Sequence, residues 1–123
     1  MTINEYQQLA LRTLNPALSE KDVLINGVMG LCGESGEAID LVKKHLAQGH
    51  PLDREALAKE LGDVAWYLAE TAHAIGYDLE TVLSMNIEKL RARYPEGFDT
   101  AASLNREDRP RLNLRCLSPA HPG

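Results

Sequence analysis

The stretch LINGVMGLCGESGE at residues 24–37 decides the fold that this sequence predicts. Apolar residues recur through it at steps of three and four, which is the spacing of one face of an α-helix. Four glycines oppose a helix, because each costs up to about 1 kcal/mol relative to alanine. They are Gly27, Gly30, Gly33 and Gly36. The alternative is a broken helix or a loop, but the apolar pattern continues in phase, so we expect a helix whose small residues let another backbone approach.

Residues that start or stop helices divide the rest of the chain into three further helices. Each start is a Ser, Thr or Asp that can accept a hydrogen bond from the first helical turn. Each stop is a proline or glycine, which interrupts helical backbone. The starts are Thr2 (in the capping-box pattern Thr2-Ile-Asn-Glu5), Ser19, Asp53 and Asp78, and the stops are Pro16, Gly49, Gly76 and Pro95. With no strand alternation and no repeat, the predicted fold class is all-α, a four-helix bundle-like domain.

Apolar seams are expected to join the second and third helices. One seam passes through Leu24, Val28, Leu31, Ser35, Ala38, Val42 and Leu46, and the other through Leu57, Leu61, Val64, Leu68, Ala72 and Ile75. A further apolar face on the second helix carries Ile25, Met29, Cys32 and Ile39. A small all-helical chain with a second apolar face gains by oligomerising, so we expect a homodimer or homotetramer.

Length and composition are those of an ordinary globular chain, with 123 residues, 44% hydrophobic and 25% charged. We place one domain at residues 1–99 and expect residues 100–123, where the helical pattern stops, to form an irregular, flexible C-terminal tail. The net charge of −5 argues against a general nucleic-acid binder. No apolar run reaches the roughly 18 residues of a membrane span, and the N-terminus lacks a signal-peptide pattern. We therefore expect a cytoplasmic protein without a membrane partner.

Two pairs of carboxylates stand in matching positions on the second and third predicted helices. They are Glu34 with Glu37 and Glu60 with Asp63. At about 100° per residue, each pair is displaced in the same direction from the seam of its own helix. The short turn at Gly49 makes the helices antiparallel, so the pairs should converge at one level. One such pair is typical of a solvated surface, but four converging carboxylates need a cation, and an all-oxygen set suits Mg²⁺ or Mn²⁺.

These residues resemble a known family. The pattern Glu34-x-x-Glu37, 22 residues, Glu60-x-x-Asp63 is similar to that of the MazG-like, all-α nucleoside triphosphate pyrophosphohydrolases. The stretches GLCGESGEA (30–38), KELGDV (59–64) and KLRARYP (89–95) are also typical of it, and the resemblance covers residues 20–98. It implies a MazG-like all-α fold and an enzyme of nucleotide-pool housekeeping that hydrolyses a nucleoside triphosphate to the monophosphate and pyrophosphate.

The resemblance also implies roles for individual residues. Carried over by motif, the four carboxylates would bind Mg²⁺, and one of them would orient or deprotonate the attacking water. Lys89 and Arg93 would face phosphate, and Asn86 would contact sugar or phosphate; for the two cations a solvated helix end is the alternative. A different class of function also stays open, a non-catalytic helical oligomerisation or interaction module whose carboxylates are solvated or bind a structural metal. Base and sugar preference is left open.

Three residues of the first and third helices are weaker candidates. Trp66 lies opposite the seam of its own helix, where it could stack on a nucleobase, although contact with another subunit is the favoured interpretation. Tyr6 and Gln7 could line a base pocket, and the sequence alone leaves this open.

Overall fold

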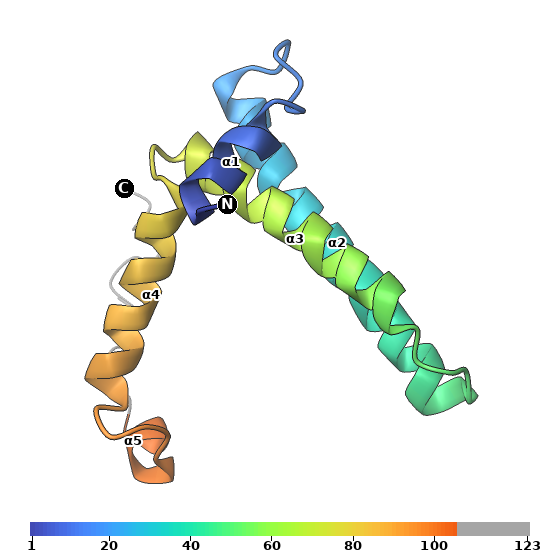
Figure 1. Ribbon diagram of the computed structural model, residues 1–123, viewed down its shortest axis with the longest axis vertical. Helices are drawn as coiled ribbons and strands as arrows, with labels where there is room; N and C mark the ends of the chain where they lie inside the picture. Colours follow the sequence, from blue (N-terminus) through green and yellow to red (C-terminus); the bar gives the residue numbers. More distant parts are fainter. Residues whose placement is uncertain (106–123) are drawn as a thin grey trace, which may run out of the picture. The chain divides into compact units, whose positions relative to one another are not determined.

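The structure is a computed structural model that describes residues 1–105, and over this range it consists of five α-helices (Figure 1). They are α1 (Ile3–Leu11), α2 (Glu20–Gln48), α3 (Arg54–Ala74), α4 (Leu79–Arg93) and α5 (Thr100–Leu104). These residues contain no strand, so the all-α fold class is confirmed. None of the described helices has the length and apolar character that crossing a bilayer requires. The chain forms two compact units, Met1–Met85 and Asn86–Gly123.

α1, α2 and α3 begin where their capping residues predict, and α2 ends at its predicted glycine, whereas α1 ends at Leu11, before the predicted stop at Pro16. Thr2 and Glu5 form a complete capping box, in which each side chain accepts a hydrogen bond from the other residue's backbone N–H. Ser19 and Asp53 likewise accept hydrogen bonds from N–H groups in the first turns of α2 and α3. Gly49 ends α2 in the left-handed conformation, with φ of 71°, which glycine adopts without steric strain.

α2 is one continuous helix of 29 residues across all four glycines, so the broken-helix alternative is wrong. Two of the glycines are needed for packing. A β-carbon on Gly27 would overlap with the hydroxyl of Thr71, and one on Gly30 would overlap with the ring of Tyr67. A β-carbon on Gly33 would have no neighbour within 4 Å in the described part of the chain. The glycines of the first half of α2 therefore let α3 approach closely, as expected.

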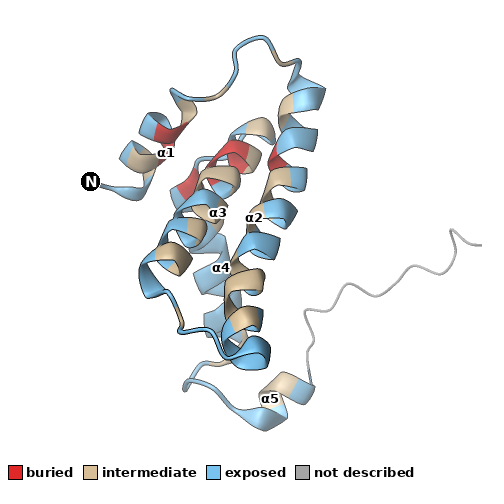
Figure 2. Ribbon diagram, turned by 90° about the vertical axis from the view of Figure 1, so that its right-hand side faces the viewer, coloured by how far each residue is buried: buried red, intermediate tan, exposed pale blue. Residues whose placement is uncertain are grey.

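α2 and α3 lie side by side and antiparallel (Figures 1 and 2). Residue numbers rise along α2 as they fall along α3 through the facing pairs. These pairs are Gly27 with Thr71, Gly30 with Tyr67, and Glu34 with Asp63. The short turn between the two helices thus produces the antiparallel arrangement that its length predicts.

The face of α2 that contacts α3 is not the predicted seam. Gly27, Gly30 and Glu34 line the contact, whereas the seam residues Val28 on α2 and Leu61 on α3 are 48% and 57% exposed. The predicted seam was wrong by about a quarter of a helical turn. The physical reason is that these helices meet where their side chains are smallest, which leaves part of the most periodic apolar face at the surface.

The small buried core lies where α1 packs against α3 (Figure 2). Ala10, Ala69 and Leu79 form its centre, and Tyr6 and Trp66 pack against them. These residues come from α1, α3 and the start of α4, all within the first unit. The core therefore joins the N-terminal helix to the α3–α4 connection.

The side chain of Gln7 forms hydrogen bonds that join α1 to the α3–α4 connection. Its side chain is 2% exposed, and its Nε2 donates to the carbonyl oxygens of Ala69 and Tyr77 at 3.1 and 3.3 Å. Its Oε1 accepts a hydrogen bond from the Leu79 N–H at 2.9 Å. Both amide hydrogens are thus used inside the fold, which gives Gln7 a structural role. Its part in a base pocket stays open.

Trp66 contacts α1 of its own chain, and the expected contact of this residue with another subunit stays a prediction. The indole N–H donates to the Ala10 carbonyl at 3.0 Å and to Thr13 Oγ1 at 2.8 Å. The Thr13 hydroxyl donates to the same carbonyl at 2.8 Å. These donors share an oxygen that a longer helix would offer to Leu14, and α1 ends at Leu11.

The second unit contains the end of α4 and all of α5. Asp99 caps α5 by accepting a hydrogen bond from the Ala102 N–H at 2.9 Å. The rings of Tyr94 and Phe98 lie 5.6 Å apart between the two helices. α5 begins inside the segment predicted to be an irregular tail, and the rest of that segment, residues 106–123, lies outside the described residues.

Replacing Gly30 by alanine is expected to destabilise the protein. The new methyl group must displace the Tyr67 ring, and such overpacking costs about 1–3 kcal/mol against a helix-propensity gain of up to about 1 kcal/mol. Gly33→Ala is the matched control, because its methyl group meets open space and should stabilise the helix. Urea unfolding followed by circular dichroism measures both variants. Equal stability of the two would contradict the close contact at Gly30.

Candidate metal centre

Three of the four carboxylates singled out by the sequence converge between α2 and α3. Glu34 lies on α2 one turn after Gly30, and Glu60 and Asp63 lie about a turn apart on α3. One oxygen from each of the three carboxylates lies within 4.8 Å of the other two. The close approach of the helices at Gly30 makes this convergence possible, because it brings the two backbones together one turn away.

Glu37 lies one turn further along α2, where its side chain is exposed and outside this group of three. Its negative charge still acts on Glu34, although less strongly than the charges of Asp63 and Glu60. The role of Glu37 as a fourth metal ligand stays a prediction.

Loss of solvent, and then repulsion within the group, raises the pKa of Glu34 above its ordinary value of 4.5. Loss of solvent around the carboxylate is the largest cause, followed by the charges of Asp63 and Glu60. Each of these effects disfavours the ionised form of Glu34 when no cation is bound. A cation placed among the three carboxylates would remove the repulsion.

Three lysines of α2 and α3 are paired with other carboxylates. Lys44 and Lys43 contact Asp40 at 2.6 and 3.3 Å, and their hydrogen bonds hold the pKa of Asp40 below its ordinary value. Lys59 pairs with Glu55 at 2.9 Å. Within residues 1–105, no lysine forms an ion pair with the converging carboxylates. Their excess negative charge therefore favours a cation from solution.

The donor set fits a hard divalent cation. Carboxylate oxygens are the ligands that Mg²⁺, Mn²⁺ and Ca²⁺ prefer, and the group offers no nitrogen or sulfur donor that would favour zinc. Two oxygens bound to one Mg²⁺ at about 2.1 Å are at most about 4.2 Å apart. Small side-chain rotations would bring oxygens that lie within 4.8 Å to that separation.

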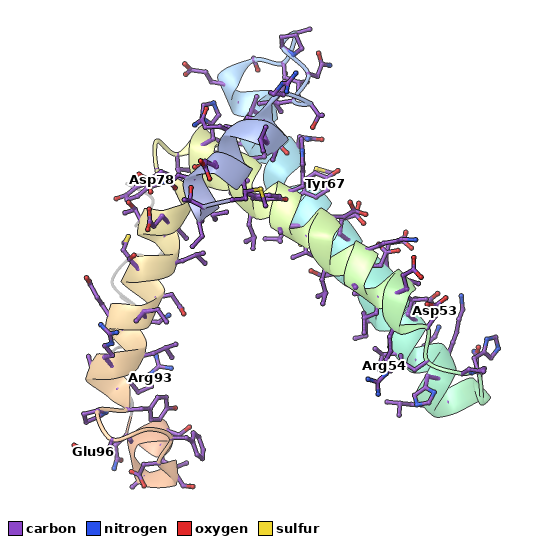
Figure 3. All side chains as sticks on the ribbon, viewed as in Figure 1. Asp53, Arg54, Tyr67, Asp78, Arg93 and Glu96 are labelled. Atoms are coloured by element: carbon purple, nitrogen blue, oxygen red, sulfur yellow. The ribbon has the colours of Figure 1, made fainter. Side chains whose placement is uncertain are left out.

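An open pocket of about 350 Å³ adjoins the carboxylates, lined by Glu34, Asp63, Trp66 and Tyr67. Tyr67 lies on the part of α3 that runs beside α2 (Figure 3). Tyr6 of α1 packs against the same core as Trp66, and burial, followed by the charge of Asp63, raises the pKa of its phenol. Tyr67 was not among the predicted site residues. The available signal was an aromatic residue one helical turn after Asp63.

The predicted phosphate- and sugar-binding residues, Asn86, Lys89 and Arg93, lie on α4 within the second unit. Their spacing of three and four residues places them on one helix face. The guanidinium of Arg93 lies 5.9 Å from the centroid of the Tyr94 ring. Their role toward a substrate stays a prediction.

The fold and the carboxylate group define an all-α protein with an acidic centre that could hold a metal ion. The family model of the MazG nucleotide pyrophosphohydrolase domain matches residues 26–98, which include all four predicted carboxylates. The chain is also 39% identical over 82 residues to the Gene 37 protein of Mycobacterium phage L5. The aligned region covers 63% of this chain and 72% of the phage protein. No solved structure matches. The chain therefore belongs to the MazG nucleotide pyrophosphohydrolase family, a family of typically metal-dependent hydrolases.

Glu34→Gln is expected to stabilise the metal-free protein at pH 7. The neutral amide removes the repulsion that raises the pKa of Glu34, and an acid with a raised pKa weakens the folded state only while it is ionised. As the pH falls toward 4.5, the wild-type carboxylate binds its proton and this penalty disappears. The advantage of the variant should therefore be largest at pH 7 and shrink toward pH 4.5. Thermal unfolding in the presence of a chelator measures it.

Glu55→Gln is the control for this experiment. Glu55 is exposed and pairs only with the exposed Lys59, so its loss should change the unfolding temperature little at either pH. Added Mg²⁺ should raise the unfolding temperature of the wild type and of Glu55→Gln more than that of Glu34→Gln. A metal-free Glu34→Gln variant that is less stable than the wild type at pH 7 would contradict the repulsion.

Proposed function

We propose that this protein is a Mg²⁺-dependent nucleoside triphosphate pyrophosphohydrolase, which converts a ribo- or deoxyribonucleoside triphosphate to its monophosphate and pyrophosphate. The convergence of Glu34, Glu60 and Asp63, in a chain that belongs to the MazG family, is the observation that carries the proposal. Mn²⁺ should substitute for Mg²⁺, because both prefer oxygen ligands. In this proposal Glu37 completes the metal-binding set from the next turn of α2.

The carboxylates have two tasks in this reaction. Most of them bind the metal, which would neutralise charge on the phosphate oxygens and lower the pKa of a bound water. One carboxylate orients the attacking water or accepts its proton. The water oxygen bonds to the α-phosphorus in line with the bridging oxygen to the β-phosphorus, and pyrophosphate leaves as that bridging bond breaks. Beyond the metal site, this displacement needs mainly accurate positioning from the protein.

Cationic and amide side chains on α4 are the proposed substrate contacts. Lys89 and Arg93 would neutralise phosphate charge, and Asn86 would donate to sugar or phosphate oxygens. We assign the activity to nucleotide-pool housekeeping in the cytoplasm, where hydrolysis of a triphosphate removes it from use by polymerases and kinases.

We also propose that the protein works as a homodimer or homotetramer. Among residues 1–105, only four apolar side chains are buried, and three of them are alanines. A core of this size is small for helices of 29 and 21 residues. On the outer face of α2, Met29 and Ile39 are each 68% exposed. A second copy that covers this face would supply the missing apolar burial.

Incubation of the purified protein with Mg²⁺ and a panel of canonical, deaminated and oxidised nucleoside triphosphates should release pyrophosphate. Asp63→Asn and Glu37→Gln should each lower kcat by at least about 100-fold, because each removes a charge that binds the metal or the water. Glu55→Gln, a carboxylate on α3 outside the group, should keep the wild-type rate. Circular dichroism checks that each variant is folded.

Absence of pyrophosphate release from every triphosphate by the folded wild type would overturn the proposed enzyme and favour the non-catalytic interaction module. Full activity in both Asp63→Asn and Glu37→Gln would overturn the assignment of the metal site alone.

Met29→Lys should weaken self-association, because it places a charge in the apolar face that a second copy would cover. Sedimentation equilibrium over a range of protein concentrations measures the effect, with Glu55→Gln as a surface control that should associate like the wild type. A wild-type protein that stays monomeric at every concentration would contradict the homo-oligomer.

A further inference from the structure

The largest fully buried side chain in the described part of the protein is a carboxylate, that of Glu70 on α3. Asn26 of α2 donates from its Nδ2 to both oxygens of this carboxylate, at 3.0 and 3.1 Å. Within residues 1–105, no lysine, arginine or histidine forms an ion pair with Glu70. Burying a carboxylate is unfavourable unless its oxygens accept hydrogen bonds, so Glu70 depends on the amide of Asn26.

The rest of the α2 face that contacts α3 repeats every three residues. Both the small residues and the acidic residues follow this spacing, at Gly27, Gly30, Gly33 and Gly36 and at Glu34, Glu37 and Asp40. Three residues make nearly one helical turn, with a rise of about 4.5 Å. A shift of α2 by three residues along α3 would therefore present almost the same pattern. Unwinding the last turn of α2 would lengthen the 49–53 connection enough to allow it.

The closest contacts between the helices permit a shift in one direction only. A shift away from the turn would place Gly33 opposite the ring of Tyr67, where Gly30 now lies. The opposite shift would place Leu24 against Thr71, where even a β-carbon has no space. Glycine packing is thus compatible with two registers, meaning two sets of facing residues: the observed register and one shifted by a turn.

Asn26 and Glu70 distinguish these two registers. In the shifted register Met29, which is 68% exposed, would occupy the place of Asn26. A thioether has no hydrogen to donate, so the carboxylate of Glu70 would be buried without its hydrogen bonds. We propose that Asn26 and Glu70 are a positioning pair, which selects the register of α2 and α3 and thereby brings Glu34 into the metal centre. This inference rests on the proposed function.

The register matters because it decides which α2 carboxylates face those of α3. In the observed register Glu34 joins the group of three, and Glu37 follows one turn later. In the shifted register Glu37 would take the place of Glu34, and Asp40 the place of Glu37. Asp40 is already paired with two lysines, at 2.6 and 3.3 Å. A carboxylate with two cationic partners attracts a divalent cation less, so the shifted centre would bind metal more weakly.

Exchanging the residues at positions 26 and 29 tests the positioning pair. The double variant Asn26→Met/Met29→Asn keeps the composition of the chain and moves the amide by almost one turn. The amide then meets the carboxylate of Glu70 only in the shifted register, so α2 should move along α3. Glu55→Gln, a surface variant of α3, is the control that should keep the observed register.

The distance between two spin labels measures the register directly. Lys21 of α2 and Lys59 of α3 are exposed, and nitroxides attached to Lys21→Cys and Lys59→Cys report on the two helices. Cys32→Ser and Cys116→Ser prevent labelling elsewhere. Because the shift moves α2 away from the turn, pulsed electron paramagnetic resonance should show a distance about 4.5 Å longer in the exchanged variant than in the wild type. Dilution with unlabelled protein restricts the measurement to one chain.

Calorimetric titration with Mg²⁺ shows whether the register chooses the metal ligand. Glu34→Gln should lower the affinity by at least about 10-fold in the wild-type background. In the exchanged background the same substitution should change the affinity by less than about twofold, because Glu34 then lies outside the centre. A pair with a purely structural role would leave Glu34 equally important in both backgrounds, and that result would overturn the positioning role.

Glu70→Met is a second variant, which decides if the exchanged variant does not fold. It removes the buried carboxylate that opposes the shift, so two label distances about 4.5 Å apart should appear. A single distance, unchanged from the wild type, would overturn the positioning pair and leave the pyrophosphohydrolase intact. A wild type that neither binds Mg²⁺ nor hydrolyses any triphosphate would overturn the proposed function, whereas the label distances would still show whether the pair selects the register.

Discussion

The contact between α2 and α3 at Gly27 and Gly30 is the constraint on which the rest of this structure depends. Any larger side chain at these positions would overlap with Thr71 or Tyr67 of the facing helix. The glycines reduce the intrinsic stability of α2 by up to about 1 kcal/mol each. In return, they let two long helices approach so closely that carboxylates one turn away meet across the interface. The packing of the backbone and the chemistry of the centre therefore have one cause.

The carboxylates lie on the helix–helix contact and not beside it, which has an electrostatic consequence. Glu34 loses solvent and faces the charges of Asp63 and Glu60, so its ionised form is disfavoured. The metal-free centre is thus a local weakness of the fold, and a bound divalent cation would convert it into a link between α2 and α3. Lys43 and Lys44 do not relieve this repulsion, because both pair with Asp40.

α1 has a second structural task, because it holds the end of the helix pair that lies beside the centre. Gln7 uses its whole amide group on the α3–α4 connection, and the C-terminal end of α1 fixes the indole of Trp66. The same interactions that bury the small core therefore position the aromatic side of the pocket. Fold stability and the shape of the pocket are coupled through this helix.

The sequence by itself determined four of the five helices in residues 1–105, where each of them starts, and the four candidate carboxylates, because helical period, capping and turn chemistry are local properties of the chain. It did not indicate α5. It also placed α2 and α3 antiparallel, since the turn between them is short. Only the tertiary structure decided which faces meet. Apolar periodicity pointed to a seam that includes Val28 and Leu61, whereas the helices meet about a quarter-turn away, where glycine permits the closest approach. The contact of Trp66 with α1 and the position of Tyr67 in the pocket likewise depend on residues distant in sequence, which no local pattern contains.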